Sequence, residues 1–157
     1  MEHKVNHSSA MMYRKFGIML LVSLGIMYLV MFLNMSSVDH FHNSVSRFYM
    51  AILMVAPMAI VMLLMMGKMY TNKKKNMIIM LSAAIVFSLA LAGLRAQVPV
   101  GDVQYMKAMI PHHSSAIMTS RNASISDPEV KKLSEKIISS QEEEIAVMER
   151  LINKLSD

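Results

Sequence analysis

Three long apolar stretches without any charged residue dominate this chain of 157 residues. They cover residues 16–33, 48–66 and 77–94, at 18, 19 and 18 residues. A helix of roughly 20 apolar residues crosses the hydrocarbon core of a bilayer, and a helix satisfies its own backbone hydrogen bonds in lipid. The first stretch is longer than the apolar core of about 7–15 residues typical of a signal peptide. The sequence therefore predicts an all-α protein with a three-span membrane region over residues 1–94.

Lys and Arg are unevenly distributed around these spans. Seven lie in the short flanks before the first span and between the second and third, and three lie in the remaining flanks. Positively charged flanks stay in the cytoplasm. We therefore expect the N-terminus and residues 67–76 to be cytoplasmic. Residues 34–47 and the C-terminal tail are then outside a bacterial plasma (inner) membrane, in the periplasm or the extracellular space.

The net charge of +5 also originates around the spans. Residues 1–94 carry 8 basic and 2 acidic side chains, whereas residues 95–157 carry 8 basic and 9 acidic ones. A tail that is close to neutral argues against nucleic acid as a partner.

The C-terminal tail is predicted to form a linker and a two-helix hairpin. Residues 95–101 contain a Pro and a Gly and form the linker. Asp102 is expected to cap a first helix that ends near Arg121, and the Asp-Pro-Glu run at 127–129 is typical of the start of a second helix, which reaches about Leu155. Two helices alone make a poor core, so residues 102–157 are expected to pair with a second copy into a four-helix bundle.

Both tail helices are amphipathic, and Met and His lie on the face of the first. At 100° per residue, Met106, His112 and His113 lie within about 60° of Met109, on the side expected to meet the second helix. The buried face of the second helix is predicted to comprise Val130, Leu133, Ile137, Ile138, Ile145, Met148, Leu151, Ile152 and Leu155.

Three further polar or soft side chains complete the candidate set. Gln141 and Glu144 fall on the apolar stripe of the second helix, where they either form ordinary hydrogen bonds or act as ligands. Met118 lies opposite Met109 on an ideal helix, but Pro111 is expected to bend the helix between them. The predicted metal-binding residues are Met106, Met109, His112, His113, Met118, Gln141, Glu144 and Met148.

Thioether and imidazole donors without thiolates favour soft metal ions. The chain has 20 Met and no Cys, so Cu(I) and, by the same softness, Ag(I) fit this set. Imidazole together with the carboxylate of Glu144 fits Cu(II) or zinc instead. The alternative is that the Met residues are ordinary core and the His pair is exposed. The chain lacks recognisable catalytic motifs, so we do not expect an enzyme.

The same residues resemble a known family. Met-Ile-Pro-His-His at 109–113, Asp-Pro-Glu-Val-Lys-Lys-Leu at 127–133 and Ile-Ile-Ser-Ser-Gln-Glu-Glu-Glu-Ile-Ala-Val-Met at 137–148 are similar to the bacterial "domain of unknown function 305" family, over about residues 101–153. The resemblance implies a ferritin-like helical bundle. Some members are exported proteins that bind copper or silver and aid metal resistance, which directs attention to the candidate residues above. The chain departs from the family pattern at Arg150, where an aromatic residue is usual, and it carries one motif copy, which strengthens the expectation of an oligomer.

Two other functions remain open at this point. Met50, Met54, Met58 and Met62 recur every four residues along the second span, and this row is either interhelical packing or a thioether path for Cu(I) transport. His40 and His42 precede that span and are either additional donors or ordinary surface residues. A membrane protein whose tail binds a protein partner without metal is the third alternative.

Overall fold

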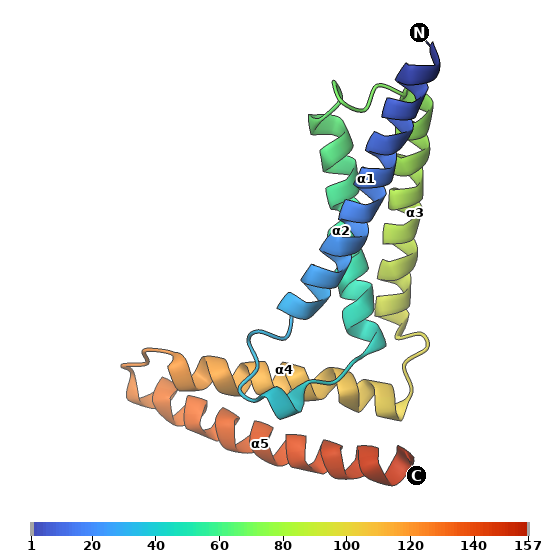
Figure 1. Cartoon of the computed structure of the whole chain (residues 1–157). Helices are drawn as coiled ribbons and strands as arrows, with labels where there is room; N and C mark the ends of the chain where they lie inside the picture. The colour runs from blue at the N-terminus through green and yellow to red at the C-terminus, as the bar shows by residue number, and fades with distance from the viewer. Residues whose placement is uncertain (1, 157) are drawn as a thin grey trace. The chain divides into compact units, whose positions relative to one another are not determined.

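The computed structural model describes residues 2–156, with side chains from residue 10 onward. Within this range the chain forms five α-helices and one short 3-10 helix, with no β-strand (Figure 1). The all-α prediction is therefore confirmed. The chain divides into two compact units, one of residues 1–29 and 48–98 and the other of residues 30–47 and 99–157.

The first unit contains the three apolar helices, which run side by side in Figure 1. They are α1 (Glu2–Val30), α2 (Val45–Met65) and α3 (Lys73–Ala96). The segments Ala10–Val30, Val45–Met65 and Lys73–Ala96 are each long and apolar enough to cross a membrane. Three candidate spans are thus present, as predicted.

Small side chains of α2 and α3 lie in the core of this unit. The core contains Ala56 and Ala59 of α2 and Ala83 of α3, packed around the aromatic rings of Phe16 and Tyr70. Residues of this size leave little side chain between two helix backbones, which favours van der Waals contact between helices in lipid. The large apolar side chains of this unit instead lie mostly on its outer surface, where the acyl chains of a membrane would cover them.

The first helix ends earlier than the apolar stretch does. α1 stops at Val30, whereas the apolar run continues to Leu33. Beyond the helix end, the guanidinium of Arg47 donates a hydrogen bond to the carbonyl of Met31 at 2.5 Å and covers the ring of Phe32 at 4.3 Å. This contact satisfies a carbonyl that no helical N–H reaches, so the chain can leave the helix before its apolar residues are used up.

The second unit is built on α4 (Asp102–Asn122) and α5 (Pro128–Ser156), which lie antiparallel in Figure 1. Both helices have the predicted limits to within one residue. The carboxylate of Asp127 accepts hydrogen bonds from the backbone N–H of Glu129 at 2.9 Å and of Val130 at 3.0 Å, which confirms it as the cap of α5. The cap predicted for α4 is wrong, because Gly101 occupies the cap position and Asp102 is the first helical residue.

Contacts between α4 and α5 form the core of the second unit. Its buried members are Met106, Ile110, Ile117, Ile145, Met148 and Ile152. The apolar stripe predicted as one buried face of α5 is buried only in part. Val130, Leu133, Ile137, Leu151 and Leu155 remain exposed. The reason is geometric: a single neighbouring helix covers a narrower arc than the stripe occupies.

Residues 34–40, which include the 3-10 helix η1 (Val38–His40), are bound to α4 through one buried hydroxyl. Ser114 is 0% exposed, and its oxygen accepts a hydrogen bond from the N–H of Ser36 at 2.8 Å. The same oxygen lies 3.0 Å from the hydroxyl of Ser36 and 2.8 Å from Nδ1 of His40. One serine of α4 therefore organises the segment that precedes α2.

Candidate functional site

An open groove runs between α4 and α5 along one side of their shared core. We call it the seam groove. Its volume is about 440 Å³. Its walls are formed by Tyr105, Met109 and His113 of α4 and by Ser140, Glu143, Glu144, Val147 and Met148 of α5. Each wall therefore carries one thioether, with the two aromatic rings on the α4 wall and the two carboxylates on the α5 wall.

His113 and Glu144 form the polar centre of the seam groove. Nε2 of His113 lies 2.6 Å from Oε2 of Glu144, and Nδ1 of His113 lies 3.0 Å from the carbonyl of Met109. The imidazole is buried, with 9% of its side chain exposed, whereas 52% of the Glu144 side chain is exposed. The ring is thus held between the two helices, while the carboxylate that pairs with it is open to solvent.

The hydrogen bonds also change the acidity of Glu144. The hydrogen bond with His113 lowers the pKa of this carboxyl below its ordinary value, and a second one from the hydroxyl of Ser140 acts in the same direction. That hydroxyl donates to Oε1 of Glu144 at 2.9 Å. Both interactions stabilise the ionised form, so Glu144 is a carboxylate at neutral pH.

The orientation of His113 matches that of a metal-ligating histidine. Such residues typically donate one ring N–H to a backbone carbonyl or carboxylate, which directs the other nitrogen to the metal. Here the Met109 carbonyl is the acceptor for Nδ1–H, and Nε2 points towards Glu144. The thioethers of Met109 and Met148 line the same groove. One imidazole, one carboxylate and two thioethers therefore line one groove, and donors of these types suit a soft or borderline ion.

Four of the eight residues predicted from the sequence line the seam groove: Met109, His113, Glu144 and Met148. Met106 is buried in the adjoining core. His112 is exposed, although its ring centre lies 6.0 Å from that of His113. Met118 and Gln141 are partly buried and lie outside the groove lining.

The sequence analysis missed four residues that also line the groove: Tyr105, Ser140, Glu143 and Val147. Tyr105 lies four residues before Met109, and Ser140 lies four residues before Glu144, so helical spacing from known members would have found both. In the part of the chain that the structure describes, no three His, Asp or Glu side chains gather closely enough to hold a metal ion. Any site in a single copy therefore relies on the thioethers in addition to the His113–Glu144 pair.

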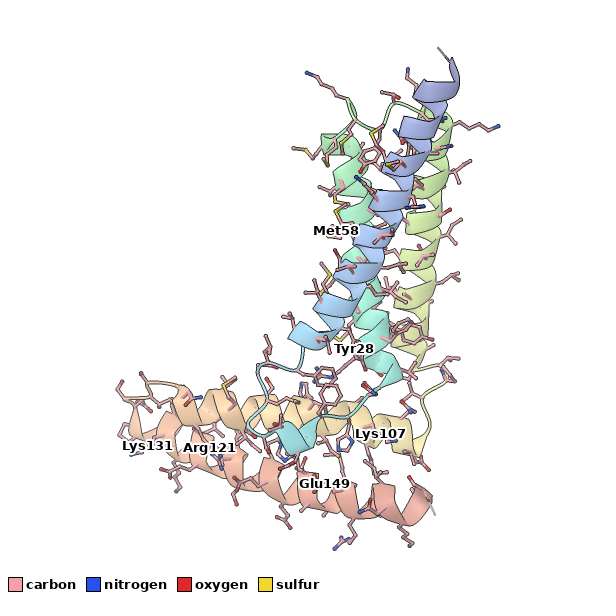
Figure 2. The ribbon with its side chains drawn as sticks, in the orientation of Figure 1. Tyr28, Met58, Lys107, Arg121, Lys131 and Glu149 are labelled. Atoms are coloured by element: carbon pink, nitrogen blue, oxygen red, sulfur yellow. The ribbon has the colours of Figure 1, made fainter. Side chains whose placement is uncertain are left out.

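A second groove, the loop groove, lies where residues 36–40 meet α4 and α5. It measures about 340 Å³ and is lined in part by His40, Arg121 and Glu149. Figure 2 shows Arg121 on α4 and Glu149 on α5 near the line where the two helices meet. Arg121 forms an ion pair with Glu142 in this groove. His40 thus lines a different groove from His113, and the structure does not bring the two together in one lining.

His42 interacts electrostatically with His40 and Glu149, which line the loop groove. Burial lowers the pKa of this imidazole, and the negative charge of Glu149 opposes that effect. Lys107 and His40 act with burial to lower it. These groups surround His42 with both signs of charge, and neither His40 nor His42 belongs to the lining of the seam groove.

The Met row of α2 contacts the core of the first unit only in part. Met50 and Met54 are 46% and 41% exposed, whereas the buried residues of this helix include Ala51 and Ala59. Met58, labelled in Figure 2, is partly buried. Met62 packs against the core of this unit, so the four residues of the row do not share one environment.

Comparison with known proteins extends the resemblance beyond the tail. The family model described as "Domain of unknown function (DUF305)" matches residues 50–152, from α2 to α5. An uncharacterized protein of Acanthamoeba polyphaga mimivirus is 33% identical over 122 residues, which cover 76% of this chain and 78% of the viral protein. No solved structure matches the chain. With two thirds of its length matched, the chain belongs to the DUF305 family.

Proposed function

We propose that this protein is a membrane-anchored metal-binding protein that takes up Cu(I) or Ag(I) in the seam groove. The observation that carries the proposal is the orientation of His113, which lies between the Met109 carbonyl and the Glu144 carboxylate in a groove that two thioethers also line. Sulfur ligands prefer soft ions, and imidazole suits copper, so monovalent copper and silver fit this set better than Mg²⁺ or Ca²⁺. Cu(II) and zinc are the second choice, through His113 and Glu144.

The buried ring and the exposed carboxylate suggest how an ion would enter. A zinc ion bound to both Nε2 and a carboxylate oxygen lies about 2.0–2.2 Å from each atom, so the two atoms must move apart from their present separation of 2.6 Å, and a larger soft ion needs more room still. Glu144 is exposed and can rotate outward, whereas His113 is fixed by the core. In this proposal Glu144 moves to admit the ion, and the ion replaces the proton that joins the two side chains.

The charge distribution supports an orientation for this binding unit. Basic residues lie in the N-terminal half of α1, before its apolar segment, and at the start of α3, where Lys73, Lys74 and Lys75 follow one another. By the positive-inside rule these flanks are cytoplasmic, so α4 and α5 lie on the opposite side of the membrane. We therefore propose a role in metal homeostasis or resistance outside the cytoplasm, by binding the ion rather than by catalysis.

Self-association belongs to the same proposal. The second unit has a core of six buried residues between two helices, and apolar side chains of α5 remain exposed. Pairing of two α4–α5 units into a four-helix bundle would cover those side chains. The exposed apolar area supports this arrangement, in which two seam grooves belong to one assembly.

Titration of Cu(I) against a chromophoric competitor tests the binding proposal, with the full chain in lipid nanodiscs. We expect the unmodified chain to compete for the ion. The double variant Met109→Leu/Met148→Leu keeps the apolar volume but removes both thioethers. Together with His113→Gln, it should weaken binding by at least about tenfold, the size of effect seen when residues around a metal site are changed.

Matched controls come from the candidates outside the groove. His112→Gln and Met118→Leu make the same chemical changes on α4, and both should leave binding within a few-fold of the unmodified chain. A full chain that never competes for Cu(I) or Ag(I) refutes the proposal. Equal losses in the groove variants and in the controls would place the donors elsewhere in the protein.

A further inference from the structure

α5 carries a second apolar face that no other described part of the chain covers. Its buried face includes Ser134, Ile145, Met148 and Ile152, which point towards α4. On the other face Val130 is 49% exposed, Leu133 57%, Ile137 36%, Val147 37% and Leu151 37%. An apolar row that extends along most of a 29-residue helix marks an interaction site in a folded protein.

The exposed face has the spacing of a coiled coil. Val130, Ile137, Glu144 and Leu151 follow one another every seven residues, and Leu133, Ser140 and Val147 repeat at the same interval three residues later. Alternation of three and four residues over three heptads is the pattern by which two helices pack along a common seam. We call these seven residues the α5 seam.

Charged residues along one edge of the seam indicate which partner fits it. Glu129, Lys136, Glu143 and Arg150 are all exposed, and each directly precedes a member of the seven-residue series. Their signs alternate. In a parallel pair of α5 helices in register, this edge lies beside the opposite edge of the second helix, where Ser134, Gln141 and Met148 carry no charge, so the four charges have no partner. In an antiparallel pair related by a two-fold axis between residues 139 and 140, every one lies level with the opposite charge.

The resulting pairs can be named. Glu129 lies level with Arg150 of the second copy, and Lys136 lies level with Glu143 of the second copy. A two-fold axis repeats each contact, so the interface contains four complementary pairs. Such edge charges set the orientation and the choice of partner in coiled coils.

A lipid surface fits the α5 seam less well than a second copy does. Helices that lie on membranes are rich in Lys and Arg on their polar face. α5 has five basic and six acidic residues, and its exposed face has a carboxylate, Glu144, at its centre. This composition offers no attraction for anionic lipids.

The seam adjoins the proposed metal site. Ser140, Glu144 and Val147 belong both to the α5 seam and to the lining of the seam groove. With the axis between residues 139 and 140, Glu144 comes level with residue 135 of the second copy and Val147 with residue 132, so Leu133 of that copy lies across the groove between them. The groove therefore receives an apolar cover from the second copy, and two grooves lie in one assembly, about 13 Å apart along α5 at a rise of about 1.5 Å per residue.

We propose that the α5 seam is the interface of an antiparallel homodimer and that Val130 and Leu133 of each copy cover the seam groove of the other. The interface stands on the heptad pattern and the edge charges, whereas the role of the cover rests on the proposed metal function. Removal of water from the groove would slow the loss of a bound ion, because the ion could leave only after the interface opens.

Single cysteines test the orientation, since the natural chain has none. With the full chain in nanodiscs or detergent under mild oxidation, Ser140→Cys lies near the two-fold axis and should form a disulfide-linked dimer with itself. Val130→Cys should not link to itself but should link to Val147→Cys when the two variants are mixed. Self-linking of Val130→Cys, or no linking in any combination, overturns the proposal.

Charge exchange tests the register with variants that alter exposed residues alone. Lys136→Glu and Glu143→Lys, made singly, each set like charges level with one another in two places, and should weaken the dimer roughly 5- to 30-fold by sedimentation. The double variant restores complementary pairs and should return the dimer to its original stability. A double variant as weak as the single ones overturns the register. Both experiments are done without metal and are compared with the separate Cu(I) titration. A stable dimer that fails to bind Cu(I) refutes the proposed function alone. A monomer that binds Cu(I) refutes this inference alone.

Discussion

Removal of one buried hydroxyl, that of Ser114, should release residues 34–40 from α4. Its oxygen interacts with three groups, the N–H of Ser36, the hydroxyl of Ser36 and Nδ1 of His40, at 2.8 Å, 3.0 Å and 2.8 Å. A serine hydroxyl can donate one hydrogen bond and accept two, so its full capacity is used here. Ser114→Ala removes all three interactions and adds no bulk.

The expected effect follows from the burial of the groups that lose their partner. Ser114 is 0% exposed, whereas Ser36 and His40 are partly exposed, so water can replace some of the lost interactions. A typical hydrogen bond contributes about 0.5–1.5 kcal/mol net, and the three share a single oxygen and are not additive. We expect a total loss of about 2 kcal/mol, which corresponds to about a 30-fold increase in the open population of residues 34–40.

Hydrogen exchange of the full chain in nanodiscs measures this opening directly. Amides of residues 34–40 should exchange about 30-fold faster in Ser114→Ala, with the Ser36 N–H most affected. Ser115→Ala is the matched control, because its hydroxyl accepts one exposed hydrogen bond from Asn34 at 2.6 Å. Its effect should stay below about 1 kcal/mol.

Two results would refute this reasoning. If exchange in residues 34–40 changes less than threefold in Ser114→Ala, other contacts hold the segment. One such contact is the tilted pair of Phe32 and Phe41, whose ring centres lie 4.2 Å apart. Equal effects of Ser114→Ala and Ser115→Ala would mean that burial does not decide the strength of these hydrogen bonds.

Two further predictions concern the acidity of the seam groove and the packing of the spans. The hydrogen bond with His113 lowers the pKa of Glu144 in the folded protein. The ionised Glu144 therefore stabilises the fold fully at pH values above the ordinary glutamate pKa of about 4.3. This stabilisation is lost as the pH falls through the lower pKa of the folded state. Hydrogen exchange of α4 and α5 between pH 7 and 3 should show this loss, and Glu144→Gln should remove it, while the exposed Glu135→Gln should not. Gly93→Ala would place a Cβ 2.7 Å from Cζ of Tyr49, displace the ring and break the 2.5 Å hydrogen bond from Tyr49 to the carbonyl of Val98. The Gly93→Ala variant should therefore melt at a lower temperature in detergent. Gly25→Ala is the control: no atom lies within 4 Å of its new Cβ, so the stability of the protein should stay the same or rise by up to about 1 kcal/mol. Equal effects at the two glycines would contradict the close approach of Gly93 to Tyr49.

The helices were predicted well, because helix starts and membrane-spanning helices both depend on residues that lie close together in the sequence. The Asp127 carboxylate caps α5 as the Asp-Pro-Glu run predicts, and the three apolar stretches form the three long helices. The cap of α4 was assigned one residue too late, because Gly101 adopts the extended cap conformation without a side-chain hydrogen bond. A cap that acts through its backbone alone leaves little trace in the residue pattern.

The candidate site was predicted only in part, because helical spacing shows which residues share a face but not which part of that face the next helix covers. Helical spacing from Met109 indicated one face, and Met109 and His113 do line the seam groove. His112 lies about 60° to the other side of Met109 and is exposed, because the single helix α5 covers a narrow arc of α4. The position of an arc depends on where the neighbouring helix crosses, and helical periodicity carries no information on that crossing.

The amino-acid sequence alone determined the all-α class, the three apolar helices, the start of α5 and the family to which the tail is similar, because each depends on residues close together in the chain. The tertiary structure decided which side chains of the two tail helices meet. It joined His113 to Glu144, directed Ser114 to residues 34–40, and left the α5 seam uncovered. These contacts depend on the rotation of each helix about its own axis, which is set when whole faces pack together and not by any short stretch of residues.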